Sequence, residues 1–237
     1  MVAGGPERET APPLGTRVDG PPARRPGPVV LDGRRGHIEK LDARRHGPAL
    51  WEAVQGHDRL WTYISYGPFA DAAEFFTWLA SRETLDDPYS YVIVDRSGKA
   101  VGVATLMEIR PRMRVCEVGH ILFSPALQRT VLATEAHYML ARYVFEALGY
   151  RRYEWKCNAL NAASYKAAIR LGFTFEGIFR QHMIIKGRNR DTAWLSMLDG
   201  EWPARKEAFE RWLEPSNFDA QGRQIVSLSS LNAQGPV

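Results

Sequence analysis

One turn in the middle of the chain has the features of an anion-binding site. It lies between the apolar run CEVGHILF and a segment whose apolar residues recur at helical spacing, so it opens a helix. A helix N-terminus presents unpaired N–H groups and the positive end of the helix dipole, and both favour a phosphate. The residues of this turn are Gln128, Arg129, Thr130, Val131, Leu132, Ala133 and Thr134. An ordinary strand-to-helix turn would show the same pattern.

Glu117 and His120 are the two side chains of that apolar run that could accept a proton. A carboxylate or an imidazole can act as a general base in a proton-transfer step. Side chains three positions apart on a regular strand face opposite sides, so a regular strand admits only one of the two to a site. Either residue could instead be a surface or packing residue.

Asn161, Ser164 and Tyr165 stand at the start of a second helix. Asn161 is a good N-cap, because its side-chain oxygen can accept an N–H of the first helical turn. Ser164 and Tyr165 are hydroxyls that could protonate a leaving group. A tyrosine on a helix surface is, however, more often a packing residue.

The remaining composition excludes several classes of function. The two cysteines, Cys116 and Cys157, lack a CxxC or a nearby histidine pair, so we predict reduced core thiols and no metal site. The 31 Lys and Arg residues are scattered among 27 Asp and Glu, which argues against nucleic acid despite the net charge of +4. No apolar run is long enough for a membrane span and residues 1–28 lack a signal-peptide core, so we predict a cytoplasmic protein.

The first part of the chain predicts short strands followed by helices. Extended stretches are expected at VVL and HIEKL, then helices from Ala43 to Gln55 and around Asp58 to Ser65. Asp71 and Glu74 have capping-box spacing and open a further helix. YSYVIVD and AVGVATLMEI then predict a β-hairpin, and CEVGHILF predicts a third strand after the RPRMR turn.

The second part predicts a helix from about Thr130 to Ala147, the strand RYEWKC and a short helix closed by Gly172. FTFEGIFRQHMIIK and DTAWLSMLDGEW would then pair across a turn from Gly187 to Arg190, and a last helix would run from Pro203 to Leu213. The fold class is therefore α/β, with a mixed, mostly antiparallel sheet flanked by helices. We expect a flexible arm over residues 1–28, one domain over 29–213 and a weakly ordered tail over 214–237.

Three segments together resemble the GNAT superfamily of N-acetyltransferases, nearest its RimJ/RimL-like branch. They are FSPALQRTVLATEA, NALNAASYKAAIRLGF and EGIFRQHMIIKGRNRDTAWLS, and the resemblance covers roughly residues 35–202. It implies the GNAT fold and acetyl-CoA as the cosubstrate, with no metal. An amine would attack the thioester directly, and the products would be an N-acetylated acceptor and CoA.

The resemblance also implies residue roles. Backbone amides near Leu122, Phe123 and Ser124, on a strand that splays from its neighbour, would stabilise the developing oxyanion. The turn at Gln128–Thr134 would bind the pyrophosphate, and Asn161 and Ser164 would contact the pantetheine arm.

Two positions depart from the family pattern. Val131 occupies a glycine position, so the phosphates would follow a slightly different path. Ala168 occupies the position of the family's tyrosine general acid, which leaves Ser164, Tyr165 or a water to protonate the thiolate. Of the two candidate bases, Glu117 fits the family's acidic position better than His120.

Three functions are compatible with these residues. The branch resemblance favours acetylation of a protein N-terminus or a lysine. A small amine such as an antibiotic or a polyamine is the alternative acceptor, and a non-catalytic acyl-CoA-binding module is the third. The hairpin residues Arg180, Arg190 and Asp191 could shape the acceptor pocket or form a salt-bridged turn. The front-end aromatics could line the acceptor cleft or belong to the core: Trp51, Trp61, Tyr63 and Phe69. We expect a monomer or a homodimer.

Overall fold

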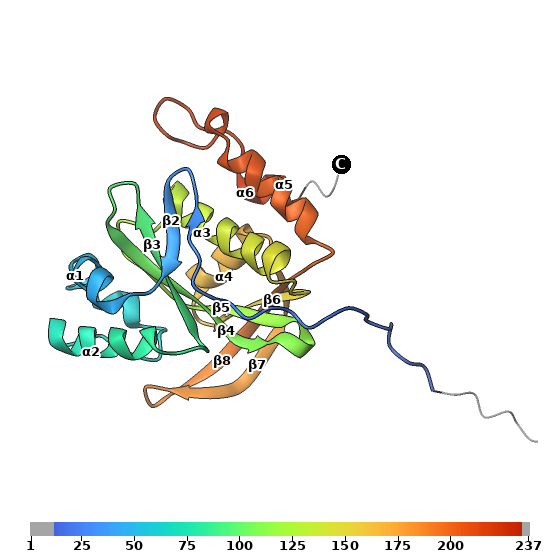
Figure 1. The fold of residues 1–237 in the computed structure, drawn as a ribbon, viewed down its shortest axis with the longest axis horizontal. Coiled ribbons are helices and arrows are strands. Elements are labelled where there is room, and N and C mark those ends of the chain that lie inside the picture. The colour runs from blue at the N-terminus through green and yellow to red at the C-terminus, as the bar shows by residue number, and fades with distance from the viewer. Residues whose placement is uncertain (1–11, 234–237) are drawn as a thin grey trace, which may run out of the picture.

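The structure is a computed structural model that describes residues 12–233. Its centre is an eight-stranded sheet in the order β1-β2-β3-β4-β5-β6-β8-β7, in which β5 and β6 form the single parallel pair among the described strands (Figure 1). The strands are β1 (Leu31–Asp32), β2 (Gly36–Lys40), β3 (Tyr89–Asp95), β4 (Ala100–Arg110), β5 (Val115–Phe123), β6 (Arg152–Asn158), β7 (Thr174–Ile185) and β8 (Arg188–Leu198). The predicted mixed, mostly antiparallel sheet is confirmed.

Within the described residues, six α-helices pack around this sheet: α1 (Ala43–Val54), α2 (Ala72–Glu83), α3 (Val131–Arg142), α4 (Ala162–Arg170), α5 (Trp202–Leu213) and α6 (Leu228–Ala233). Short 3-10 turns are η1 (Asp58–Trp61), η2 (Pro111–Met113) and η4 (Pro215–Asn217), and a π-helical turn, η3 (Tyr143–Ala147), extends α3. None of the helices in the described part of the chain has both the length and the apolar character needed to cross a bilayer.

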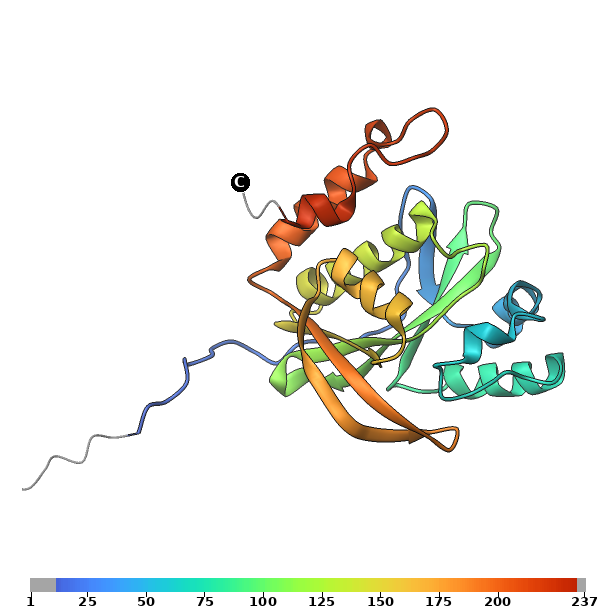
Figure 2. The same cartoon turned by 180° about the vertical axis from the view of Figure 1, so that it is seen from behind.

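The two faces of the sheet bury different helices. On β3, Val92 and Val94 pack in a cluster with the apolar residues of α1 and α2. Tyr91 and Ile93 alternate with them and pack in the larger cluster with α3 and α5. In Figures 1 and 2, α1 and α2 lie together at one end of the molecule, and the β7–β8 hairpin curves beneath the sheet toward them.

The helix caps follow the sequence signals closely. Asp71 Oδ1 accepts the Glu74 N–H at 2.9 Å, and Glu74 Oε2 accepts the Ala70 N–H at 2.8 Å. The two hydrogen bonds resemble a capping box, except that Glu74 accepts the N–H of Ala70 and not that of Asp71. The helix expected around Asp58–Ser65 is only the 3-10 turn η1, since the chain turns away after Trp61.

The last hairpin turns earlier than expected. Its turn consists of Lys186 and Gly187, both with positive φ, and β8 starts at Arg188. Arg190 and Asp191 therefore lie on the strand and not in the turn. A two-residue turn of this kind matches the strand twist better than the four-residue turn that we expected.

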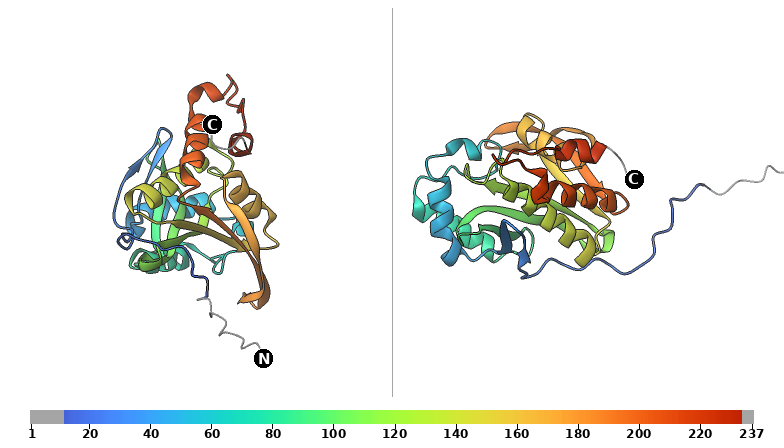
Figure 3. Two further views of the ribbon diagram at one scale, coloured as in Figure 1. Left: turned by 90° about the vertical axis from the view of Figure 1, so that its right-hand side faces the viewer. Right: turned by 90° about the horizontal axis from the view of Figure 1, so that it is seen from above.

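Segments near both ends of the described chain pack against the domain. Before β1, the Tyr91 hydroxyl donates to Gly27 O at 2.9 Å, and the Gly27 N–H donates to the Tyr143 hydroxyl at 3.2 Å. After α5, Leu228 and Leu231 of α6 are buried in the larger core cluster, and α6 packs on α4 and α5 (Figure 3). The flexibility predicted for residues 1–28 and 214–237 stays a prediction, and residues 1–11 and 234–237 lie outside the described part.

Candidate active site

Two neighbouring strands part in the middle of the sheet. β5 and β6 pair in parallel from Val115–Arg152 to Val118–Trp155, and their pairing ends there. β6 continues to pair with β8 as far as Asn158–Thr192. The residues of β5 that follow Val118 therefore have one open edge, and a gap lies between the two strands.

A β-bulge brings both candidate bases to the same face of the sheet. His120 has φ 48°, and the β4–β5 register shifts beside it. Val118 packs in the cluster under α3, whereas Leu122 packs in the cluster under α1 and α2, although residues four apart on a regular strand share a face. Glu117, which alternates with Val118, therefore shares a face with Leu122 and His120. A regular strand would have admitted only one of Glu117 and His120 to the site, but the bulge lets both face it.

The Phe123 N–H points into the gap. Ser124 donates its N–H to Val101 O of β4 at 3.2 Å. Successive N–H groups of a strand point to opposite edges, so the Phe123 N–H points away from β4, toward the side where β6 has diverged. This assigns the open backbone donor of the segment Leu122–Ser124 to Phe123.

The turn before α3 is built largely from its own hydrogen bonds. Thr130 is the N-cap, and its hydroxyl accepts the Ala133 N–H at 3.1 Å. Gln128 donates from Nε2 to Phe123 O at 2.9 Å, which ties the turn to the end of β5. Arg129 has φ 63°, and its side chain is exposed. α3 begins at Val131, so the first N–H groups of the helix lie at the end of the gap.

Several side chains of the predicted cofactor segment have structural contacts instead. Ser124 is fully buried and its Oγ accepts the Leu127 N–H at 3.3 Å. Thr134 Oγ1 accepts a hydrogen bond from Arg170 of α4 at 3.0 Å. The side chains of Leu122 and Leu132 are buried in the two apolar clusters, and those of Val131 and Ala133 pack against the larger one. The buried residues among them, Leu122, Ser124, Leu132 and Thr134, could contact a ligand only through their backbone.

Glu117 is a buried carboxyl with a cationic partner. Its Oε2 lies 2.7 Å from Lys156 Nζ of β6, and both side chains are at least nine-tenths buried. Burial raises the pKa of Glu117 to about 7, and the Lys156 charge opposes this increase only in part. A carboxyl with a pKa near the working pH has the properties of a general base.

His120 is a much weaker base. Burial, together with the charges of Arg82 and Arg190, lowers its pKa to about 4. The ring is therefore neutral at pH 7, and its Nδ1 lies 3.1 Å from the hydroxyl of Tyr66. His120 is held in place by the segment that follows η1.

Asn161 and Ser164 are brought to the same gap from α4. Asn161 caps α4, with its Oδ1 accepting the Ser164 N–H at 3.1 Å, which confirms the predicted N-cap. Ser164 Oγ accepts the Trp155 Nε1–H at 3.0 Å, beside the last β5–β6 pair. A hydroxyl oxygen that accepts one hydrogen bond can still donate its own proton.

Tyr165 does not share that position. Its ring packs edge-on against Phe175 of β7, at 5.6 Å between centroids, and against the larger core cluster. Adjacent residues of a helix point in different directions, so Ser164 faces β6 while Tyr165 faces β7.

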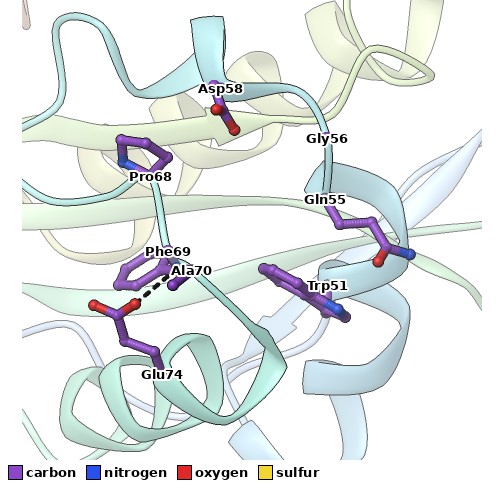
Figure 4. Close-up of a pocket in the computed structure, with 8 residues that line it drawn as sticks. All are labelled: Trp51, Gln55, Gly56, Asp58, Pro68, Phe69, Ala70 and Glu74. Carbon is purple, nitrogen blue, oxygen red and sulfur yellow. Dashed lines mark hydrogen bonds between the residues drawn. The ribbon is translucent and has the colours of Figure 1, made fainter.

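The front-end aromatics divide between core and surface. Trp61 is buried in the cluster of α1 and α2. Trp51 and Phe69 line an open cavity of about 520 Å³ between α1, η1 and α2 (Figure 4). The lining of that cavity includes no residue of β5, β6 or β8, so these two aromatics do not line the gap.

Lys156 and Tyr66 are site residues that the sequence reasoning missed. Lys156 could have been found, because in RYEWKC the charged residues alternate with Tyr153, Trp155 and Cys157, which indicates one polar face. Tyr66 carries no such signal, since its contact with His120 spans 54 positions.

No group of three possible metal ligands from His, Cys, Asp and Glu comes together among residues 12–233. The site is built from backbone donors, the carboxyl of Glu117 with its partner Lys156, a histidine and hydroxyls. This arrangement could stabilise a developing oxyanion and move protons.

The chain is similar to known acetyltransferases. A family model described as an acetyltransferase (GNAT) domain matches residues 38–174. A search of curated protein sequences finds no match. A GCN5-related N-acetyltransferase from Brucella melitensis is 44% identical over 91% of this chain and 99% of its own, with a TM-score of 0.89.

Two further solved structures are also similar. A GNAT-family protein from Chromobacterium violaceum is 43% identical over 84% of this chain and 100% of its own, with a TM-score of 0.76. RimL, a ribosomal L7/L12 α-N-protein acetyltransferase, is 20% identical over 72% of this chain and 94% of its own, with a TM-score of 0.62. At that identity RimL shows a shared fold alone.

Proposed function

The chain belongs to the GNAT acetyltransferase family, and on that premise we propose that it transfers the acetyl group of acetyl-CoA to a primary amine at the gap between β5 and β6. Members of this family are acyltransferases that use acetyl-CoA. The observation that carries the proposal is the parting of β5 from β6 after Val118–Trp155, directly before the N-terminus of α3. The gap offers an open backbone donor, and the helix start offers N–H groups for phosphate.

The residues of the gap support direct attack of the amine on the thioester. The amine nitrogen forms a bond to the carbonyl carbon, the Phe123 N–H stabilises the oxyanion, and the C–S bond then breaks. Glu117 accepts the amine proton through a water chain, because its raised pKa suits a base near neutral pH. Ser164 donates a proton to the departing thiolate and regains one from solvent.

One feature favours a small amine over a protein N-terminus as the acceptor. The Tyr63 hydroxyl donates to Leu160 O at 3.2 Å, and Lys186 Nζ donates to Trp61 O at 2.9 Å. The segment after η1 is thereby joined both to the β6–α4 loop and to the tip of the β7–β8 hairpin. These two hydrogen bonds narrow the route by which an acceptor reaches the gap. A protein N-terminus would need a wider route than a small amine.

Thermal unfolding with and without millimolar acetyl-CoA tests the cosubstrate site. A ligand at 100 times its Kd adds about 2.7 kcal/mol to the free energy of unfolding, which raises the Tm by several degrees. CoA release in the presence of an amine panel then tests turnover. An unchanged Tm together with no CoA release would contradict the proposal.

A further inference from the structure

Arg190 places a cationic group on the wall of the gap that the proposed mechanism does not use. Arg190 belongs to β8 and pairs with Met183 of β7. It lies two residues before Thr192, the first residue of β8 that pairs with β6. Side chains two apart on a strand share a face, so Arg190 lies on the face of Thr192 and Trp194. Lys156, the partner of Glu117, stacks over the Trp194 ring on that same face, 4.1 Å from the ring centroid.

The Arg190 guanidinium is only partly paired. Within residues 12–233 its side chain makes one hydrogen bond, from Nε to Thr192 Oγ1 at 3.2 Å, and no ion pair. The side chain is half-buried, and burial lowers its pKa, with the Glu117 charge acting in the opposite direction. Its two Nη groups are left to bind something else. A desolvated guanidinium with free Nη groups is well suited to a planar anion.

The carboxyls nearby already have cationic partners. Glu117 binds Lys156, and Glu154 binds Arg110 and Arg152 at 3.0 and 2.8 Å. Among residues 12–233 Arg190 pairs with no carboxylate, which leaves its positive charge in excess on this face. An acceptor that entered as a bare ammonium ion would meet this excess positive charge, whereas an acceptor with its own negative group would neutralise it.

We propose that the amine acceptor carries a carboxylate close to its amino group, and that Arg190 binds this carboxylate through its Nη atoms while the amine faces Phe123 and Glu117. Two parallel N–H···O bonds would fix the orientation of a compact amino acid-like substrate. The inference rests on the proposed acetyl transfer and adds the class of its acceptor. It makes Arg190 a substrate-binding residue of β8.

Acceptor pairs that share a carbon skeleton test the proposal, when their rates are compared at equal concentrations of the unprotonated amine. Glycine, β-alanine, γ-aminobutyrate and the α-amino acids are each compared with the matching carboxamide, by acetyl-CoA-dependent CoA release. We expect kcat/KM to be at least about 10-fold higher for the best carboxylate than for its amide, since hydrogen bonds to charged groups contribute about 1.5–3 kcal/mol. Equal rates for acids and amides would overturn the proposal.

Variants assign the effect to Arg190. Arg190→Gln should lower kcat/KM for the carboxylates by about 10- to 100-fold. The kcat/KM for the amides should stay within a few-fold of the parent value, and the KM for acetyl-CoA should not change. Arg188→Gln, an exposed position two residues away on the same strand, is the control and should behave as the parent. A loss that is equal for acids and amides, or a raised KM for acetyl-CoA, would overturn the assignment.

The two possible failures are distinguishable. If neither acids nor amides release CoA and acetyl-CoA does not raise the Tm, the proposed function itself is wrong. If amines are acetylated without any preference for the carboxylate, the function stands and only the acceptor class is wrong. Thermal unfolding of Arg190→Gln with acetyl-CoA shows whether that variant keeps its fold and its cosubstrate site.

Discussion

Glu117 and His120 lie on one face of the sheet, yet their surroundings give them opposite chemistry. Burial raises the pKa of the Glu117 carboxyl to about 7 and lowers that of the His120 imidazole to about 4. In both cases the low-dielectric site disfavours the charged form. Glu117 is therefore half protonated near neutral pH, whereas His120 is neutral throughout the physiological range.

The pH profile of the reaction should report this difference. Glu117 works as a base only when it is deprotonated, so kcat should fall as the pH drops below about 7. Glu117→Gln should lower kcat by about 10²- to 10⁴-fold and remove that acidic limb. His120→Gln should keep the limb. An unchanged acidic limb in Glu117→Gln would exclude Glu117 as the base. The variant does not leave Lys156 without a carboxylate partner, because Lys156 Nζ also lies 3.1 Å from Glu154 Oε2.

Ser164 has both a structural and a chemical role to separate. Ser164→Ala should lower kcat by about 10²-fold or more and change acetyl-CoA binding little, if its hydroxyl protonates the thiolate. Trp155→Phe removes the same hydrogen bond but keeps the hydroxyl. Steady-state kinetics of both variants decide between the roles. Equal losses of kcat in the two variants would mean that Ser164 acts only by holding Trp155.

At the scale of elements, Asn161 caps α4 and is also predicted to contact acetyl-CoA. Asn161→Ala should lower the free energy of unfolding by about 1 kcal/mol through loss of the cap and should also weaken acetyl-CoA binding. Asn161→Asp keeps an oxygen acceptor for the Ser164 N–H but loses the amide donor.

Chemical denaturation and acetyl-CoA titration of both Asn161 variants separate the two effects. Asn161→Asp should keep the stability of the parent and lose affinity. Parental affinity in Asn161→Asp would show that capping is the sole role of Asn161.

The sequence was informative for elements and poor for their irregularities. The strand and helix periods, the Asp71 and Asn161 caps and the turn before α3 were all readable from local patterns. The bulge at His120 was not, because a positive φ at a histidine has no local signature and is imposed by the β4–β5 register. Tyr66 joins the gap through its contact with His120, 54 positions away, which periodicity cannot locate.

For the whole molecule, the segment before β1 adds to stability through backbone hydrogen bonds of Ala23 and Arg24 and through one buried hydroxyl. Tyr91 is fully buried and donates to Gly27 O. A variant that begins at Val29 should lose at least about 1–3 kcal/mol of unfolding free energy, because the Tyr91 donor is left unsatisfied and the bonds of Ala23 and Arg24 are lost as well. A variant that begins at Gly20 keeps Gly27 and is the matched control. Equal Tm values for the two truncations would show that these contacts add nothing.

The two buried cysteines determine how the CoA-release assays can be run. Cys116 and Cys157 are both at most 5% exposed, and burial raises the pKa of each thiol. The thiolate is the reactive form, so neither should react readily with a colorimetric disulfide reagent or with air. The native protein should therefore give a low blank in a CoA-detection assay, and it can be stored without a reducing agent that would consume the dye.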